Sequence, residues 1–295
     1  MKSSRTGVSG MPDAVCVNGA AGTELSVTDR GLHYGDGLFE TIACVGGRPR
    51  LLDRHLRRLA LGCGRLKLAP PDMSALDTEV HQLAAAAPRS IIKILVTRGP
   101  ARGRGYGVSG DEIASRIVLR YPWPEEGRAA SRDGVQIRLA QTRLGENVAL
   151  AGLKHCNRLE QVLARCEWDD PAIAEALMFS SSGALISGTM SNVFLVDNSR
   201  LLTPRLDRCG VAGIMRGLIL EEAAQAAVPV VECRLEAAAL EQAGELFLSN
   251  ALWGVRPVRA LGSVSLGPGE LTRHLQRRIA ARLTAAAHAG AAGDA

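Results

Sequence analysis

The chain has 295 residues, is 46% hydrophobic and carries a formal net charge of +5. It is long enough for one large or two modest domains, and it contains no run of about 18 apolar residues that would span a membrane. Its seven cysteines are odd in number and form no C-x-x-C pair, so we expect reduced thiols in a cytoplasmic protein without a metal site.

The N-terminal part is predicted to mix strands and helices. Residues 41–52, TIACVGGRPRLL, have the pattern of two strands joined by a glycine turn. Helices are expected at residues 53–65 and 73–86, and strands rich in β-branched residues at 90–99 and 115–122. The apolar residues that share one face of the first helix are Leu56, Leu59, Ala60 and Cys63.

A change of composition follows at residues 121–134, YPWPEEGRAASRDG. Prolines, charges and small residues are typical of a linker. We therefore expect a smaller N-terminal domain at residues 1–122, a linker at 123–133 and a larger C-terminal domain at 134–295 that carries Lys154.

The C-terminal part is also predicted to mix strands and helices. Hairpins are expected at residues 175–187 and 192–204, two further strands at 245–262, and a last helix at 271–287. Strands and helices do not alternate strictly, so the pattern favours an α+β fold over a doubly wound sheet.

A helix is predicted directly after the turn that contains Lys154. Asn157 is a candidate N-cap, and Glu160 three residues later completes a capping-box pattern. Apolar residues at helical spacing predict one buried face. These residues are Leu159, Val162, Leu163 and Cys166.

Two features of this part indicate chemistry. Residues 210–216, GVAGIMR, form a glycine-rich entry into a helix, which suits phosphate binding or simply a tight turn. Lys154 has apolar neighbours, which favour a nucleophilic amine, although a lysine can also extend its ammonium to water. A reactive lysine and a phosphate site together indicate pyridoxal phosphate.

Several segments then resemble, in chain order, the fold-type-IV pyridoxal-phosphate enzymes. This superfamily includes branched-chain and D-amino-acid transaminases and the 4-amino-4-deoxychorismate lyases. The matching segments are VTDRGLHYGDGLFET (27–41), HLRRL (55–59), RGRGYG (102–107), AGLKHCNRLEQV (151–162), SGTMSNVF (187–194), GVAGIMR (210–216) and SNALWGVRPV (249–258).

The resemblance implies a role for each matching position. Lys154 would bind the cofactor covalently, Arg58 would contact its phosphate, and the amides of Ile214 and Met215 would complete the phosphate site. Asn250 and Ala251 would line the phosphate side of the pocket.

Three further residues are assigned to the substrate by the same resemblance. Tyr121 would face the substrate, and Arg104 and Tyr106 would bind its carboxylates. Arg104 can equally be a solvated loop residue.

Ser187 departs from the superfamily, whose members usually carry a glutamate against the pyridine nitrogen at this position. A hydroxyl cannot stabilise a pyridinium as a carboxylate does. The substitution favours elimination over transamination, because loss of enolpyruvate forms an aromatic ring. Another acid close in space, or a shifted alignment, would weaken this argument.

The resemblance therefore predicts a homodimeric lyase that converts 4-amino-4-deoxychorismate, an anionic small molecule, to 4-aminobenzoate and pyruvate in folate biosynthesis. A D-amino-acid or branched-chain transaminase is the alternative on the same fold. A non-catalytic protein that binds RNA or another anion through the basic residues 98–107 is the alternative of another class. Sparse aromatic residues argue against nucleic acid.

Overall fold

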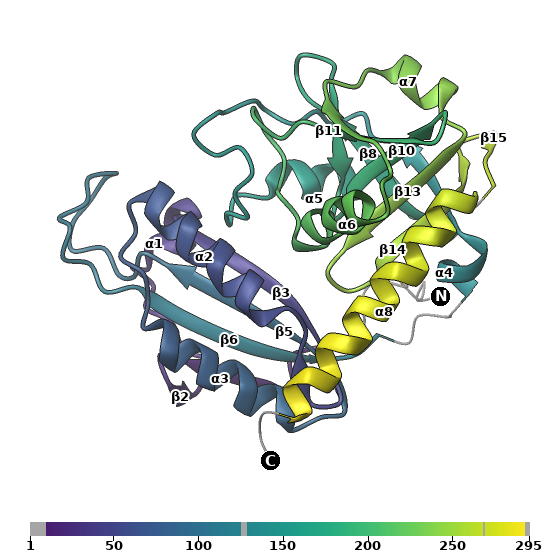
Figure 1. The fold of residues 1–295 in the computed structure, drawn as a ribbon. Helices are drawn as coiled ribbons and strands as arrows, with labels where there is room; N and C mark the ends of the chain where they lie inside the picture. Colours follow the sequence, from purple (N-terminus) through teal and green to yellow (C-terminus); the bar gives the residue numbers. More distant parts are fainter. Residues whose placement is uncertain (1–9, 125–128, 268, 293–295) are drawn as a thin grey trace, which may run out of the picture. The chain divides into compact units, whose positions relative to one another are not determined.

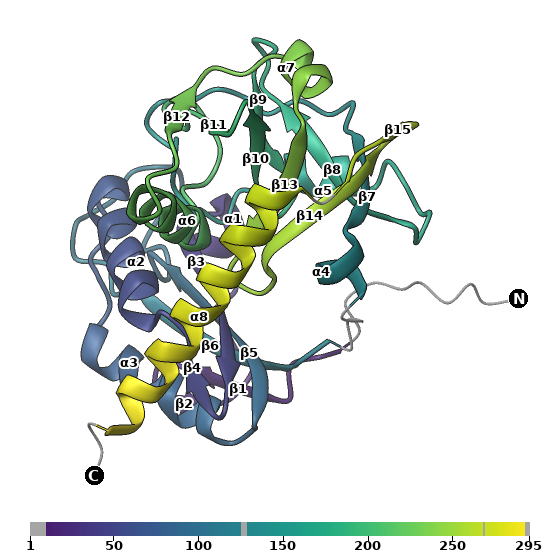
Figure 2. The same cartoon turned by 45° about the vertical axis from the view of Figure 1, so that its right-hand side comes forward.

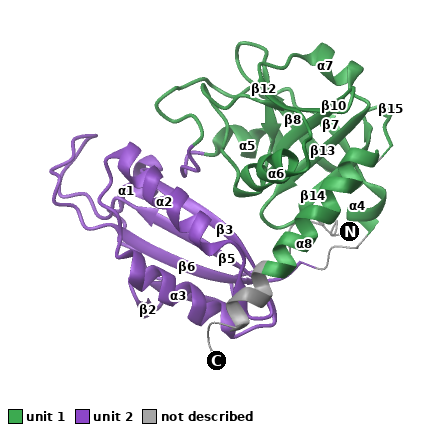
Figure 3. Cartoon of the chain, viewed as in Figure 1, with its two compact units in different colours: residues 1–7, 125–152, 158–295 green, residues 8–124, 153–157 purple. Residues whose placement is uncertain are grey.

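The computed structural model describes residues 10–124, 129–267 and 269–292 (Figure 1). These residues form two compact units (Figure 3). Unit 2 contains residues 10–124 and 153–157, and unit 1 contains the rest of the described chain. The expected domain limits at 122 and 134 stay a prediction. Residues 153–157, which include Lys154, belong to unit 2 with the N-terminal residues, whereas the prediction placed them in the C-terminal domain. Residues 125–128 of the expected linker lie outside the described chain.

Unit 2 is an antiparallel sheet with helices. Its strand order is β2-β1-β6-β5-β3-β4. The elements are β1 (Ala14–Val17), β2 (Ala20–Ala21), α1 (Arg30–Tyr34), β3 (Gly37–Val45), β4 (Arg48–Pro49), α2 (Leu52–Leu66), α3 (Met73–Ala85), β5 (Arg89–Thr97) and β6 (Ser115–Pro122). The predicted hairpin, both helices and both β-branched strands are thereby confirmed.

Helix α2 packs on β3 through a face that the sequence predicted only in part. Leu59 and Cys63 are buried as expected, but His55 is also buried, at 1% exposure, while Ala60 is exposed. The buried stripe is displaced from Leu56 toward His55 because the imidazole has a carboxylate partner on β3. A purely apolar pattern cannot reveal such a partner.

Unit 1 contains a mixed sheet of order β12-β11-β10-β13-β14-β7-β8-β9, with β15 paired to β14 (Figures 1 and 2). The pairs β7–β8, β7–β14 and β11–β12 are parallel. The strands are β7 (Val135–Leu139), β8 (Ile173–Phe179), β9 (Leu185–Gly188), β10 (Asn192–Asp197), β11 (Arg200–Pro204), β12 (Val230–Cys233), β13 (Glu245–Asn250), β14 (Gly254–Leu261) and β15 (Val264–Ser265). The predicted hairpins β8–β9 and β10–β11 and the strand pair β13–β14 are confirmed.

The helices of unit 1 are α4 (Ala129–Asp133), α5 (Leu159–Arg165), α6 (Ile214–Gln225), α7 (Ala237–Gln242) and α8 (Glu270–Ala292). Helices α6 and α8 pack on each other, and two arginines of α8, Arg278 and Arg282, donate to the buried Glu222 of α6. Phe194 of β10 and Phe247 of β13 are both fully buried, and their rings stack with their centroids 4.9 Å apart. None of the helices described in either unit combines the length and hydropathy needed to cross a bilayer.

Helix α5 corrects two predictions. Its N-cap is Arg158 rather than Asn157, and no side chain caps the helix. Its predicted buried face is exposed, at 76% for Leu159, 54% for Val162 and 59% for Leu163. Burial comes instead from Ala164 on the other side, so helical periodicity identified an apolar face correctly but not what covers it.

All seven cysteines are free, as expected for reduced thiols. Burial raises the pKa of Cys44, Cys63 and Cys209 to about 11. These three thiols therefore stay protonated and unreactive near neutral pH.

Candidate active site

Lys154 lies in a short extended segment that pairs with the first residues of β3. Its carbonyl accepts a hydrogen bond of 2.9 Å from the Phe39 amide, and the Cys156 amide donates one of 2.9 Å to the Gly37 carbonyl. The Lys154 Nζ atom lies 4.1 Å from the centroid of the Phe39 ring. Backbone pairing and an aromatic face, which attracts an ammonium, together fix the position of this amine.

Asn157 holds the same segment against the end of α1. Its Nδ2 donates to the Gly35 carbonyl at 3.1 Å. Gly35 has a φ of +63°, and a Cβ there would lie 2.6 Å from the Asn157 Oδ1 atom. Glycine is therefore required at position 35 both by its backbone conformation and by this close approach.

Glu40, His55 and Arg58 form a cluster between β3 and α2. Arg58 donates to the Glu40 carboxylate through Nε at 2.8 Å and Nη2 at 2.5 Å, and His55 Nδ1 lies 2.6 Å from Glu40 Oε2. Burial by itself would raise the pKa of Glu40, but the hydrogen bonds from His55 and Arg58 and the charges of both lower it. Burial lowers the pKa of His55. Glu40 is thus the charged acceptor, and a neutral His55 donates to it from Nδ1.

The charges of the two cations singled out by the sequence act on the pKa of this imidazole. After burial, which is the largest cause, the charges of Arg58 and Lys154 also lower the pKa of His55 against the opposing effect of Glu40. A charge shifts the pKa of a neighbour mainly at short range. In unit 2 the predicted phosphate arginine shares the Glu40 carboxylate with His55, and the predicted cofactor lysine lies over the ring of Phe39, the residue before Glu40.

The glycine-rich turn before α6 is a compact backbone structure in unit 1. The Gly152 amide donates to the Gly210 carbonyl and the Ala212 amide to the Gly152 carbonyl, both at 3.0 Å. These two hydrogen bonds join Gly152 to the turn within unit 1. A Cβ at Gly213 would lie 2.1 Å from the Asn192 Oδ1 atom, so only glycine allows this approach.

Helix α6 begins directly at this turn with its first amides uncovered by a cap. Gly213 is the N-cap in an extended conformation and offers no side chain, and Ile214 and Met215 are the first two helical residues. The first amides of a helix have no partner within the helix and favour an anion. The amides of Ile214 and Met215 thus lie in the first turn of α6, and their role in phosphate binding stays a prediction.

Glu175 is a functional candidate that the sequence did not reveal. It is fully buried on β8, and its carboxylate accepts hydrogen bonds from the Thr189 and Met190 amides at 2.9 and 3.1 Å and from the Ser191 hydroxyl at 2.9 Å. It also accepts one from the Thr189 hydroxyl. The turn that follows Ser187 is thus built around a buried acid. A glutamate in an otherwise apolar strand was the available signal.

The remaining predicted residues of unit 1 adjoin the same turn. Ser187 is the third residue of β9 and is 8% exposed. Asn250, at the end of β13, donates weakly to the Met190 carbonyl at 3.4 Å, and its Oδ1 accepts from the Leu252 and Trp253 amides. Ala251 follows Asn250 in this turn. The Met190 carbonyl therefore connects the predicted phosphate side to the turn after Ser187.

The predicted substrate residues of unit 2 are not brought together. Arg104 and Tyr106 lie on the exposed loop between β5 and β6, before the first residue of β6. Tyr121 lies near the far end of β6 and pairs with Ile91. Tyr121 is six positions along β6 from Ser115, which corresponds to about 20 Å. The register also places Tyr121 four residues, or about 13 Å, along β6 from the row that contains Phe39.

A comparison with protein families matches the amino-transferase class IV model to residues 37–261. The chain belongs to this family. The aminodeoxychorismate lyase of Vibrio harveyi is 34% identical over 267 residues, which cover 89% of this chain and 98% of that protein.

Solved structures of the class IV fold agree with this assignment. The 4-amino-4-deoxychorismate lyase of Pseudomonas aeruginosa is 46% identical, with a TM-score of 0.86 and coverage of 90% of this chain and 97% of that chain. The branched-chain amino acid aminotransferase of T.th., in complex with pyridoxamine 5'-phosphate, has a TM-score of 0.81 at 22% identity and covers 93% and 95% of the two chains. The fold-type-IV prediction is confirmed.

The class IV signature segments contain the acid–base cluster of unit 2 that the sequence did not single out. Glu40 belongs to the first segment, and His55 stands three residues before Arg58, a spacing that places both on one helical face. That spacing was a usable signal. The pairing with Glu40 depends on how α2 packs on β3 and could not be read from the sequence.

Proposed function

We propose that this chain is a pyridoxal-phosphate-dependent lyase that converts 4-amino-4-deoxychorismate to 4-aminobenzoate and pyruvate. The observation that carries the proposal is the Lys154 amine, which lies over the Phe39 ring on a segment that pairs with β3. The 46% identity to a lyase supports this reaction over transamination, since the T.th. aminotransferase is only 22% identical.

Each unit contains residues that suit part of pyridoxal phosphate. The uncapped start of α6 offers amides for a phosphate, and glycine at position 213 allows the close approach of the Asn192 side chain to this turn. Arg58 is held in a fixed direction by Glu40 and adds a planar cation. When bound, the cofactor supplies an aldehyde that condenses with amines and a ring that withdraws electrons from the substrate.

Lys154 has two tasks in this proposal. Its amine would hold the cofactor covalently. With the substrate bound, the Lys154 amine removes the proton at C4 of the substrate ring as a general base. The C3–O bond breaks, the enolpyruvyl group leaves, and the Lys154 ammonium can return the proton to it, so that pyruvate forms.

Ser187 and Glu175 suit elimination in this proposal. Ser187 provides only a hydroxyl where the superfamily usually has a glutamate, and the buried Glu175 is committed to amides and hydroxyls of the following turn. Because elimination forms an aromatic ring, the reaction would need less electron withdrawal by the cofactor than transamination does.

We further propose that Arg104 and Tyr106 bind substrate carboxylates and that Ser187, Ile214, Met215, Asn250 and Ala251 line the cofactor site. The role of Tyr121 rests on resemblance alone.

A homodimer in the cytoplasm is part of the proposal. The free cysteines suit a reducing compartment. Leu159, Val162 and Leu163 form an exposed apolar face on α5, which a second copy would cover. A charged residue in place of Val162 should then shift the protein toward monomer in light scattering, whereas Val264→Asp, on the β14–β15 hairpin, should not.

An assay with 4-amino-4-deoxychorismate tests the proposed reaction. The protein supplied with pyridoxal phosphate should release pyruvate and 4-aminobenzoate in equal amounts, and Lys154→Ala should release neither. Amino transfer to 2-oxoglutarate without pyruvate would show a transaminase instead.

A further inference from the structure

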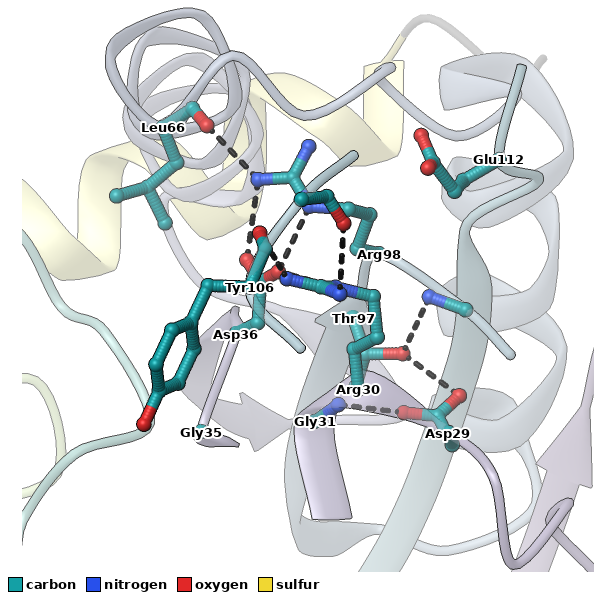
Figure 4. A network of polar contacts seen from close by, with 12 residues as sticks. Asp29, Arg30, Gly31, Gly35, Asp36, Leu66, Thr97, Arg98, Tyr106 and Glu112 are labelled. Carbon is teal, nitrogen blue, oxygen red and sulfur yellow. Dashed lines mark hydrogen bonds and ion pairs between the residues drawn. The ribbon is translucent and has the colours of Figure 1, made fainter. Parts of the chain in front are cut away.

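The glycine-rich loop, defined as residues 102–107, is attached to the rest of unit 2 in an unusual way. None of the described backbone–backbone hydrogen bonds involves residues 102–108. Its main anchor is one side chain of α1, the Arg30 guanidinium (Figure 4). Arg30 Nη1 donates to the Gly105 and Gly107 carbonyls at 3.2 Å each, and Nη2 donates to the Tyr106 carbonyl at 3.1 Å.

Arg30 is itself rigidly held. Its side chain is 6% exposed, and its Nε donates to Asp36 Oδ2 at 2.9 Å. Arg98 donates to both oxygens of Asp36, at 2.7 and 3.1 Å, and also to the Leu66 and Lys67 carbonyls. Burial by itself would raise the pKa of Asp36, but the hydrogen bonds from Arg98 and Arg30 lower it. A charged network therefore fixes the direction of the Arg30 guanidinium.

Aromatic contacts also connect Arg30, through Tyr34, to Tyr106 in the loop. The Arg30 guanidinium lies 5.0 Å from the Tyr34 ring centroid, and the Tyr34 ring lies 5.2 Å from that of Tyr106. Tyr106 is nevertheless 83% exposed. The contacts set the direction of its ring without covering it.

The three carbonyl contacts determine where the loop amides point. The described chain contains no cis peptide bond, and in a trans peptide the N–H points opposite to the C=O. Because the carbonyls of 105, 106 and 107 face Arg30, the amides of Tyr106, Gly107 and Val108 face away from it. None of these amides donates to a described residue. Consecutive amides on one side of a loop form a concavity that favours an anion.

We infer that Arg30 is a positioning residue, which fixes residues 105–107 so that their outward amides and the Arg104 side chain meet a carboxylate of the substrate. The identity of that substrate rests on the proposed function, but the fixing of the loop does not. Arg30 does not touch the substrate. It fixes the loop that contacts the substrate, and in this way it determines how tightly the substrate binds.

Arg30→Lys tests the inference, because lysine keeps the charge but cannot span three carbonyls and Asp36 together. Loss of two or more hydrogen bonds corresponds to about a tenfold effect. We expect trypsin to cleave after Arg102 and Arg104 about tenfold faster, KM to rise by a similar factor, and kcat to change by less than about threefold.

Arg116→Lys is the matched control. Arg116 is also a largely buried arginine of unit 2 paired with a carboxylate, Glu79, but no described contact joins it to the glycine-rich loop. The Arg116→Lys variant should show the same rate of trypsin cleavage in the loop and the same KM as the natural protein. Unchanged cleavage in a folded Arg30→Lys variant would overturn the inference, whatever reaction the enzyme performs.

A second measurement uses the unaltered enzyme and covers the case that Arg30→Lys does not fold. Cleavage after Arg102 and Arg104 should slow when 4-aminobenzoate or pyruvate is added, since each carries a carboxylate of the proposed substrate. Equal cleavage rates with and without both compounds, at concentrations that inhibit turnover, would contradict the inference.

Discussion

Arg58 donates two hydrogen bonds to the Glu40 carboxylate, one from Nε and one from Nη2. This bidentate contact lies where the sequence suggested only a phosphate-binding arginine. It fixes the plane of the guanidinium before any ligand arrives. Glu40 is therefore a structural condition for the proposed role of Arg58.

Glu40→Gln should lower both stability and cofactor affinity. The substitution leaves the Arg58 charge without its carboxylate partner in a site where the Glu40 side chain is 1% exposed, so the free energy of unfolding should fall by about 3 kcal/mol. Urea unfolding and titration with pyridoxal phosphate measure the two effects.

Glu79→Gln is the control for this prediction, because Glu79 is also paired with an arginine and 10% exposed. It should destabilise the protein without weakening cofactor binding. If both variants weakened the cofactor equally, the specific role of Glu40 would be wrong.

The same cluster predicts a pH dependence of stability. The folded pKa of His55 is lowered from its ordinary 6.5, mainly by burial, so the unfolded chain binds the proton more readily. The free energy of unfolding should therefore fall as the pH drops below 6.5, by at most about 1.4 kcal/mol per pH unit. Glu40, whose pKa is lowered from 4.5, adds a further loss below that value.

His55→Gln separates the two steps of this pH dependence. The variant should lose the decline that begins near pH 6.5 and keep the acid step of Glu40. An unchanged pH profile, measured by urea unfolding at each pH, would show that His55 is not buried in its neutral form.

Gly213→Ala should impair cofactor binding. The added Cβ would lie 2.1 Å from the Asn192 Oδ1 atom, which must move and with it the start of α6. We expect at least a tenfold loss of affinity for pyridoxal phosphate, or about 1.4 kcal/mol, measured from the absorbance of the bound cofactor.

Gly217→Ala provides the comparison inside the same helix. A Cβ at Gly217 meets nothing within 4 Å, so this variant should be as stable as the natural protein or up to about 1 kcal/mol more stable. Equal cofactor affinities of the two variants would argue against a phosphate site at the start of α6.

The sequence predicted helices and hairpins better than it predicted which parts of the chain pack against them. The hairpin over residues 192–204 and helix α2 follow from turn residues and periodicity, which act within a few positions of the chain. The exposed face of α5 and the buried His55 could not be predicted, because each depends on what packs against the element. Motif resemblance singled out Lys154 and Arg58, whose roles stay predictions. Glu175 and Arg30 emerge only from their hydrogen bonds to a turn and a loop.

Glu175→Gln should weaken the turn after Ser187. One oxygen of the carboxylate becomes an amide nitrogen that cannot accept from Met190 or Ser191, and the free energy of unfolding should fall by about 2 kcal/mol. Cofactor affinity should fall as well, because the same turn contacts Asn250.

Glu167→Gln is matched to this variant, because Glu167 also accepts from two backbone amides, at Gln141 and Thr142. It should affect stability alone. If Glu175→Gln bound the cofactor as tightly as the natural protein, Glu175 would have only a structural role.

The most direct measurement of the central claim is chemical reduction of the holoenzyme followed by mass spectrometry of its peptides. Borohydride should join the cofactor permanently to one lysine, and the peptide carrying the added mass should contain Lys154. Lys154→Arg, treated in the same way, should carry none. A cofactor attached to another lysine, or a natural protein that gains no mass after binding pyridoxal phosphate, would contradict the account.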